Sequence, residues 1–314
     1  MKNKKAFIFI ILAGLFWGMS AIFVNLLSVY GFTPVQLTAV RATVAFALIG
    51  AFVAVKNRSA FSITLKRLPL FISLGVTLFF SAFLYYSSMV RTSVCTAVIL
   101  LNLHPIYVTT FSAIFYRERL SKVKLSSIAA MLLGCAFVSG IFGGLELDPL
   151  GLVLGILSGV SYASYILLVK YYNQEGIPSS TANVYSFLFM AAVALSVSDP
   201  VNIVEITAAK PMPILPLLFG IGICTSVIPF VLNGIALRDL SAGTVSALSI
   251  VEPLSATVYS VVFFGEPMDA WKIVGVVLIL GAVVFLGLDE IWSERALKKV
   301  SAESSEKKKY EFSS

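Results

Sequence analysis

The residues with the greatest capacity for chemistry lie at the middle of two apolar segments that resemble each other. Residues 91–118 read RTSVCTAVILLNLHPIYVTTFSAIFYRE and residues 239–266 read DLSAGTVSALSIVEPLSATVYSVVFFGE. Aligned without a gap, His104–Pro105 falls on Glu252–Pro253. Each copy is long enough to cross a bilayer and carries one ionisable side chain at its centre. Because such groups are costly in hydrocarbon and are kept for function, we expect this pair to mark the centre of a transport pathway.

Each ionisable side chain has a functional and a structural interpretation. The Glu252 carboxyl could contact a substrate amine or carry a coupling proton, or it could join helices as a buried hydrogen-bonding group. His104 is the one histidine of the chain and could titrate near physiological pH beside a carboxylate, or it could be a satisfied core residue. Arg41 lies about 10 Å into its segment, where it could bind a substrate carboxylate, lock helix packing or extend outward along its stem.

Aromatic and amide side chains at similar depths complete the predicted substrate-binding set. Side chains of these types more often serve packing than ligand contact. We include Trp17, Tyr85, Tyr86, Asn102, Tyr162, Tyr165 and Asn233.

Three prolines within apolar segments are the predicted hinges. Proline has no N–H, so the carbonyl four residues upstream lacks its helical partner. By this rule Pro105 leaves the carbonyl of Leu101 unpaired, and Pro253 does the same to Ser249. Pro229 is the third hinge.

The composition predicts an all-α membrane protein. Hydrophobic residues make up 58% of the 314 residues and charged residues 12%. Ten apolar stretches approach the roughly 20 residues that a helix needs to cross a bilayer, and none shows the alternation of a membrane strand. They cover about 6–28, 34–55, 68–90, 93–116, 124–143, 150–172, 179–198, 213–237, 241–264 and 270–289.

The distribution of the basic residues predicts the orientation. With the N-terminus in the cytoplasm, the Lys and Arg residues fall on the inner side except Arg41, Arg91, Lys210 and Lys272. This asymmetry follows the positive-inside rule. We therefore expect a multi-pass protein of the cytoplasmic membrane with both termini inside, and the net charge of +7 gives no support for nucleic-acid binding.

The chain reads as a duplication. Gly14-x-x-x-Gly18-x-Ser20 in the first stretch returns as Gly155-x-x-x-Gly159-x-Ser161 in the sixth. Because five helices per copy is an odd number, the second copy must enter the membrane from the opposite side, as in many secondary transporters. We expect a first repeat over 1–143, a second inverted repeat over 150–289 and a polar cytoplasmic tail over 290–314.

No catalytic or metal-binding signature is present in the sequence. It lacks GxSxG, HExxH and a Walker loop, so ATP does not drive transport directly and no enzyme activity is expected. One His and one Glu do not make a metal site, and Cys95, Cys135 and Cys224 are isolated in apolar stretches. We expect no cofactor and no metal.

The sequence resembles the EamA family of the drug/metabolite transporter superfamily over residues 6–288. The resemblance rests on Trp17-Gly18-x-Ser20, on Thr33-Pro34 with Arg41 downstream, and above all on ALRDLSAG at 236–243, followed by Glu252-Pro253 and Gly265-Glu266. It implies a ten-helix carrier that exports amino acids, related metabolites or toxic compounds. His104 departs from the family pattern, where a less basic residue is expected.

The combined prediction is a secondary active or facilitative exporter of small metabolites that works by alternating access, with the two halves rocking about a midplane site. Its partners would be a small-molecule substrate, the lipid bilayer and, as a candidate coupling ion, the proton. The protein would be a monomer or a weak homodimer. Two alternatives stay open. One is an antiporter or importer of phosphorylated or nucleotide-linked solutes, and the other is a non-transport membrane sensor, scaffold or enzyme.

Overall fold

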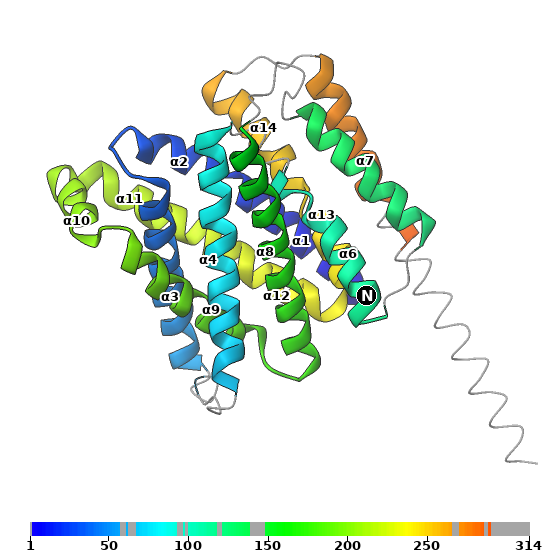
Figure 1. Cartoon of the computed structure of the whole chain (residues 1–314), viewed down its shortest axis with the longest axis horizontal. Coiled ribbons are helices and arrows are strands. Elements are labelled where there is room, and N and C mark those ends of the chain that lie inside the picture. The colour runs from blue at the N-terminus through cyan, green and yellow to red at the C-terminus, as the bar shows by residue number, and fades with distance from the viewer. Residues whose placement is uncertain are drawn as a thin grey trace, which may run out of the picture.

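The computed structural model describes residues 2–56, 61, 67–92, 97, 100–117, 121–138, 148–265, 270–285 and 288–289, and the regular structure in them is helical throughout (Figure 1). The expected cytoplasmic tail at 290–314, Cys95 and most of the expected loop at 143–149 lie outside the described residues.

The helices follow one another with short connections. Their bounds are α1 Lys2–Gly18, α2 Ser20–Ser28, α3 Pro34–Lys56, α4 Leu68–Arg91, α6 His104–Phe115, α7 Lys122–Val138, α8 Pro149–Gln174, α9 Ser179–Val197, α10 Pro200–Ala209, α11 Pro211–Gly222, η4 Ile223–Val227, α12 Ile228–Asp239, α13 Ala242–Leu248 and α14 Val251–Phe264. A further apolar helix covers Ala270–Phe285.

Seven helical stretches in the described residues are long and apolar enough to cross a membrane. They are Lys4–Ser28, Pro34–Lys56, Leu68–Ser88, Pro149–Gln174, Ser180–Val197, Pro211–Asp239 and Ala242–Phe263. Over the residues described, the helices in the other three predicted stretches are shorter: α6 has 12 residues, α7 has 17, and the last is Ala270–Phe285. The chain is therefore an all-helical protein with multiple membrane-spanning segments.

The two aligned midplane segments are both interrupted just before their prolines. A turn at residues 102–103 precedes α6, and a turn at residues 249–250 separates α13 from α14. The carbonyls expected to be unpaired both have partners: Ser249 O accepts from the backbone N–H of Glu252 at 2.9 Å, and Leu101 O accepts from the His104 ring. That expectation was wrong because the chain turns at this point, which brings new donors to the carbonyls that proline leaves free.

The third predicted hinge follows a different irregularity. Residues Ile223–Val227 form one turn of π-helix between α11 and α12, and Pro229 lies in the first turn of α12. Within the π turn, the Thr225 hydroxyl donates to the carbonyl of Ile221. A π turn breaks the regular i to i−4 ladder, so the helix axis can change direction here.

The closest helix contacts join helices from opposite halves of the sequence. α4 packs along α8, as Figure 1 shows, while α1 packs along α12 and α14. By these contacts α1, α2, α3, α11, α12 and α14 form one packing group, and α4, α6, α8 and α9 form a second. The contact of α3 with α9 joins the groups. Two sequence halves moving as separate rigid bodies is not what this packing favours, because each half supplies helices to both groups.

Glycines permit the closest of these approaches, and they do so in matching ways. A Cβ on Gly18 of α1 would collide with Ser255 and would lie 2.8 Å from the backbone nitrogen of Ala256. A Cβ on Gly159 of α8 would lie 3.0 Å from the carbonyl oxygen of Leu100 and 3.3 Å from the Tyr107 ring. Tyr107 and Ser255 occupy equivalent positions in the aligned segments, so the two small-residue faces make corresponding contacts.

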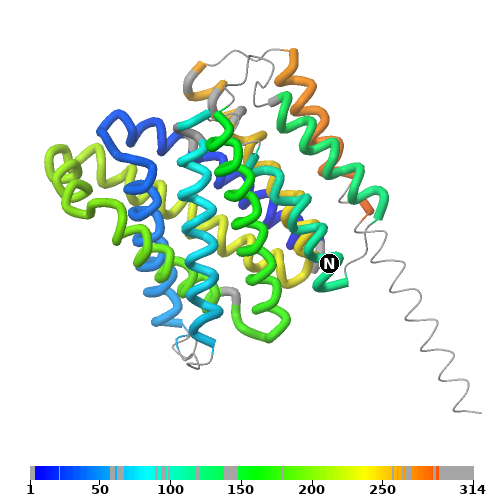
Figure 2. The backbone as a smooth tube through the Cα atoms, viewed as in Figure 1, coloured from blue at the N-terminus to red at the C-terminus, as the bar shows by residue number. Residues whose placement is uncertain are grey.

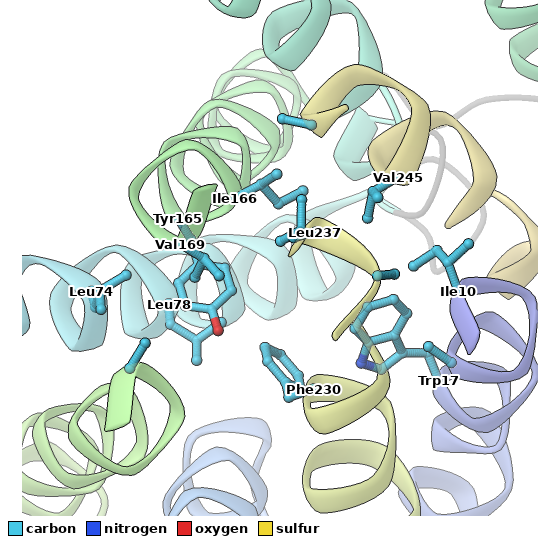
Figure 3. Packing of buried hydrophobic residues seen from close by; sticks show 14 of the residues in the cluster. Ile10, Trp17, Leu74, Leu78, Tyr165, Ile166, Val169, Phe230, Leu237 and Val245 are labelled. Atoms are coloured by element: carbon cyan, nitrogen blue, oxygen red, sulfur yellow. The ribbon is translucent and has the colours of Figure 1, made fainter. Parts of the chain in front are cut away.

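The peripheral helices pair with each other. Figure 2 shows α7 beside the helix Ala270–Phe285 at one edge of the molecule. A Cβ on Gly134 of α7 would lie 2.8 Å from the carbonyl oxygen of Gly275. The main core lies between the two packing groups, where Tyr165 and Val169 of α8 face Phe230 and Leu237 of α12 (Figure 3).

Candidate functional site

A cavity lies between the two packing groups near the middle of the helices. It offers about 70 Å³ to the centres of water molecules, where about 10–15 Å³ is enough for one water. Eight residues that the sequence singled out line it: Trp17, Arg41, Tyr85, Tyr86, Asn102, His104, Tyr162 and Glu252. The remaining lining comes from Ser20, Leu78, Ser81, Ala82, Leu101, Thr225 and Phe230.

His104 lies at the start of α6 and is held at both ring nitrogens. Its side chain is 3% exposed, with Nδ1 3.0 Å from Leu101 O and Nε2 3.1 Å from Ser249 Oγ. A carbonyl only accepts, so Nδ1 carries a hydrogen and donates it. His104 thereby joins the two interrupted segments across their crossing point.

The Ser249 hydroxyl has two acceptors for one hydrogen. Its Oγ lies 2.7 Å from Ser246 O and 3.1 Å from His104 Nε2. When the ring is neutral, Ser249 donates to Nε2; when Nε2 is protonated, it donates to Ser249 and the serine hydrogen turns to Ser246 O. The state of the ring thus selects the partner of this serine.

Arg41 and Glu252 line the same cavity without pairing. No nitrogen–oxygen distance between them is 4.0 Å or less, and Arg41 Nε is buried without a hydrogen-bond partner among the described residues. Glu252 lies in the first turn of α14, where the helix dipole favours a carboxylate. The cavity therefore presents one cationic and one anionic group that a ligand can meet.

Aromatic rings form one wall of the cavity. The His104 and Tyr162 ring centres are 4.9 Å apart, and those of Trp17 and Tyr162 are 6.4 Å apart, both edge to face. Phe230 packs against Trp17 at 5.5 Å. Edge-to-face packing of this kind is favourable and holds the rings in fixed orientations. The wall is thus apolar and rigid.

The structure does not bring every predicted residue to the cavity. Tyr165 is 1% exposed and stacks behind Tyr162 at 6.1 Å, so it supports the wall without lining it. Asn233 is buried in α12 away from the cavity lining. The hinge prolines Pro105, Pro229 and Pro253 also stand outside the lining.

Several lining residues were missed by the sequence analysis. Ser20 belongs to the repeated glycine motif, and Thr225 lies four residues before Pro229, so both had a usable signal. Ser81 and Ala82 had none, because a small side chain on an apolar helix looks the same whether it faces a cavity or a neighbouring helix. Within the described residues, no group of three or more His, Cys, Asp or Glu side chains could hold a metal ion.

Comparison with known proteins decides the family. The EamA-like transporter family matches residues 4–140 and 149–288. The chain belongs to the EamA-like transporter family. The resemblance drawn from the sequence motifs is thereby confirmed, and the protein is a membrane transporter in kind.

The relatives share this description at low identity. A Bacillus subtilis uncharacterized transporter, YxxF, is 28% identical over 67% of this chain and 66% of its own length. A Clostridium kluyveri uncharacterized transporter is 24% identical over 96% of this chain and 99% of its own. The Escherichia coli threonine/homoserine exporter RhtA is 25% identical over 75% of each chain.

One solved crystal structure has the same fold. It matches with a TM-score of 0.76 at 20% identity, and the match covers 91% of this chain and 97% of the other.

Proposed function

We propose that this protein is a secondary exporter of small zwitterionic metabolites such as amino acids, with ten membrane helices in two inverted repeats and both termini in the cytoplasm. The observation that carries the substrate class is the unpaired Arg41 and Glu252 at one cavity. An α-amino acid places a carboxylate and an ammonium group on one carbon. Arg41 would receive the carboxylate and Glu252 the amine, with the substrate side chain against Trp17 and Tyr162.

The exporter RhtA supports the same class, since its described substrates, threonine and homoserine, are amino acids. Charge argues against phosphorylated or nucleotide-linked solutes. In the described part of the chain Arg41 is the one Lys or Arg that lines the cavity. A phosphate group of two negative charges would call for more cationic partners than this.

The inverted arrangement is supported by the reciprocity of the contacts. α1 packs on α12 and α14 as α8 packs on α4 and α6. Each pair in the first set becomes the pair in the second when the two repeats are exchanged. Interrupted helices at equivalent positions beside a central cavity are also a recurring feature of transporters built from inverted repeats.

The test is transport by purified protein in liposomes. Labelled amino acids, a phosphorylated sugar and a nucleotide sugar are each supplied inside, and efflux is followed. We expect efflux of one or more amino acids and none of the phosphorylated solutes. Efflux of a phosphorylated solute alone, or no efflux of any amino acid from functionally folded protein, would overturn the substrate class.

Proton coupling is tested separately through Glu252→Gln, which keeps the shape of the side chain and removes its titration. In a proton-coupled carrier the variant exchanges labelled for unlabelled substrate yet no longer responds to a pH gradient. A facilitative carrier would show no gradient response in either protein. If Glu252→Gln and His104→Ala both leave transport and its pH dependence unchanged, the assignment of the site is wrong.

A further inference from the structure

The connection between α12 and α13 is unusually buried. Leu237 and Ala242 are 0% exposed and Leu240 is 1% exposed. Connections between helices ordinarily run over the surface, because their backbone polar groups need partners. This turn therefore requires a specific source of hydrogen bonds.

Lys170 of α8 supplies them. Its Nζ donates to Leu237 O at 2.9 Å and to Leu240 O at 2.8 Å. The last carbonyls of a helix have no partner within that helix and carry the negative end of its dipole, so a lysine ammonium suits this position. Both distances are typical of charge-assisted hydrogen bonds.

These bonds cross the boundary between the two packing groups. Lys170 belongs to the second group through α8, whereas the turn follows α12 of the first. Next to them the same boundary is filled by packed side chains, with Ile166 and Val169 of α8 near Leu237 (Figure 3). This end of the boundary is sealed.

The cavity lies toward the opposite end. Its α4 lining, Leu78 to Tyr86, belongs to the C-terminal half of Leu68–Arg91, and Arg41 lies in the N-terminal half of α3. In the proposed orientation both are the outer halves, while Lys170 near the end of α8 is at the cytoplasmic side. Substrate arriving from the cytoplasm must pass the sealed end.

The repeat shows that the seal is one-sided. The alignment of Gly14 with Gly155 places Val29 at the position equivalent to Lys170. Val29 is 84% exposed and has no ammonium group to donate. A second contact reinforces the cytoplasmic side alone: Lys124 Nζ of α7 lies 3.3 Å from Ser241 Oγ, in the same turn.

We propose that Lys170 is a latch whose hydrogen bonds to Leu237 and Leu240 hold the cytoplasmic end of the path closed and must break for substrate to enter. The proposal rests on the orientation and alternating access proposed above. Lys170 touches no substrate in this role; it positions the α12–α13 turn against α8. Losing the latch shifts the protein toward the state that is open to the cytoplasm.

The test measures access to Val245, which is 0% exposed in α13 beyond the turn. Val245→Cys is introduced after Cys95, Cys135 and Cys224 are replaced by alanine. A membrane-impermeant maleimide is added to inside-out vesicles, and the labelling rate is compared with and without Lys170→Met. Lys170→Arg keeps donors for two carbonyls, and Lys56→Met removes a basic residue of the same predicted side that makes no contact with the turn.

We expect Lys170→Met to raise the labelling rate about tenfold, because two charge-assisted hydrogen bonds are lost, and the two control variants to label like the parent. An unchanged rate in Lys170→Met overturns the latch. Lys170→Gln is the second variant should Lys170→Met not survive a thermal-stability check in detergent, and an unchanged rate there has the same meaning.

The labelling needs no substrate, so the two proposals fail separately. A raised rate together with no amino-acid efflux contradicts the substrate assignment and supports the latch. Efflux in the parent together with unchanged labelling contradicts the latch alone.

Discussion

His104 connects two chain interruptions that are far apart in sequence. Its ring contacts Leu101 O on its own segment and Ser249 Oγ on the other. The Leu101 carbonyl has the His104 ring as its acceptor partner in place of the N–H that Pro105 lacks. The residue thus has a structural role even if it also contacts substrate, and the two roles predict different measurements.

We expect His104→Ala to lower the free energy of unfolding by about 1–3 kcal/mol, because it leaves a buried carbonyl and a serine hydroxyl without their partner. Ser249→Ala should cost less, since it removes only one of the two contacts. Thermal denaturation in detergent compares the variants. Equal stability of His104→Ala and the parent would contradict the connecting role.

Arg41 is expected to act on substrate affinity and not on stability. Its Nε has no hydrogen-bond partner among the described residues, so the side chain gains one only when ligand arrives. Arg41→Gln should raise KM for an amino acid about tenfold or more, the range for loss of a charged hydrogen bond, with little change in melting temperature. A lowered melting temperature with unchanged KM would assign Arg41 to helix packing.

At the scale of elements, α8 begins with a cap that also joins it to α4. Asp148 accepts from the backbone N–H groups of Leu150 at 2.8 Å and Gly151 at 3.2 Å, and pairs with Arg91 at 3.0 Å. The Gly151 N–H foremost, and then the Arg91 side chain, hold the pKa of the Asp148 carboxyl below its ordinary value of 3.8.

This lowered pKa fixes the direction of a pH effect. A carboxyl whose folded pKa is depressed stabilises the protein above its unfolded pKa, and the contribution is lost as the pH falls through the folded pKa. We expect the melting temperature of the parent to exceed that of Asp148→Asn well above pH 3.8, and the gap to shrink below it.

Two variants separate the parts of the Asp148 contact. Asn can still accept from the α8 backbone, so Asp148→Asn reports the ion pair, whereas Asp148→Ala removes the cap as well. A gap between parent and Asp148→Asn that does not depend on pH would contradict the assignment.

The close crossing of α1 and α14 depends on Gly18. A Cβ there would collide with Ser255 and approach the backbone of Ala256, which cannot move aside as a side-chain tip can. Gly18→Ala should therefore lower the free energy of unfolding by about 1–3 kcal/mol. Gly281→Ala is the matched control, since nothing lies within 4 Å of a Cβ built there. Equal melting temperatures for the two variants would show that the crossing tolerates expansion.

At the scale of the whole molecule, the orientation is open to direct labelling. Val29 is 84% exposed after α2, and Lys56 ends α3 at the opposite end of the molecule. In a cysteine-free background we expect Val29→Cys to react with an impermeant maleimide in intact cells, and Lys56→Cys only in inside-out vesicles. The reverse pattern would invert the membrane orientation, and with it the direction assigned to the latch.

The sequence by itself determined the family, the helical class, the places where the midplane helices break, and eight of the residues that line the cavity. These follow from local rules, because the length of an apolar run, the missing N–H of proline and the cost of a charge in hydrocarbon need no knowledge of neighbours. The duplication could be read from the sequence for the same reason.

Only the tertiary structure decided which helices pair and which side chains face the cavity. In a membrane both the lipid-facing and the core-facing sides of a helix are apolar, so Tyr165 at 1% exposed and Tyr171 at 38% exposed look alike in sequence. The same holds for Lys170: its two carbonyl partners lie on another helix, and the chain order gives no sign of them. Contacts between distant segments are set by the packing of surfaces, and that packing exists only once the helices have assembled.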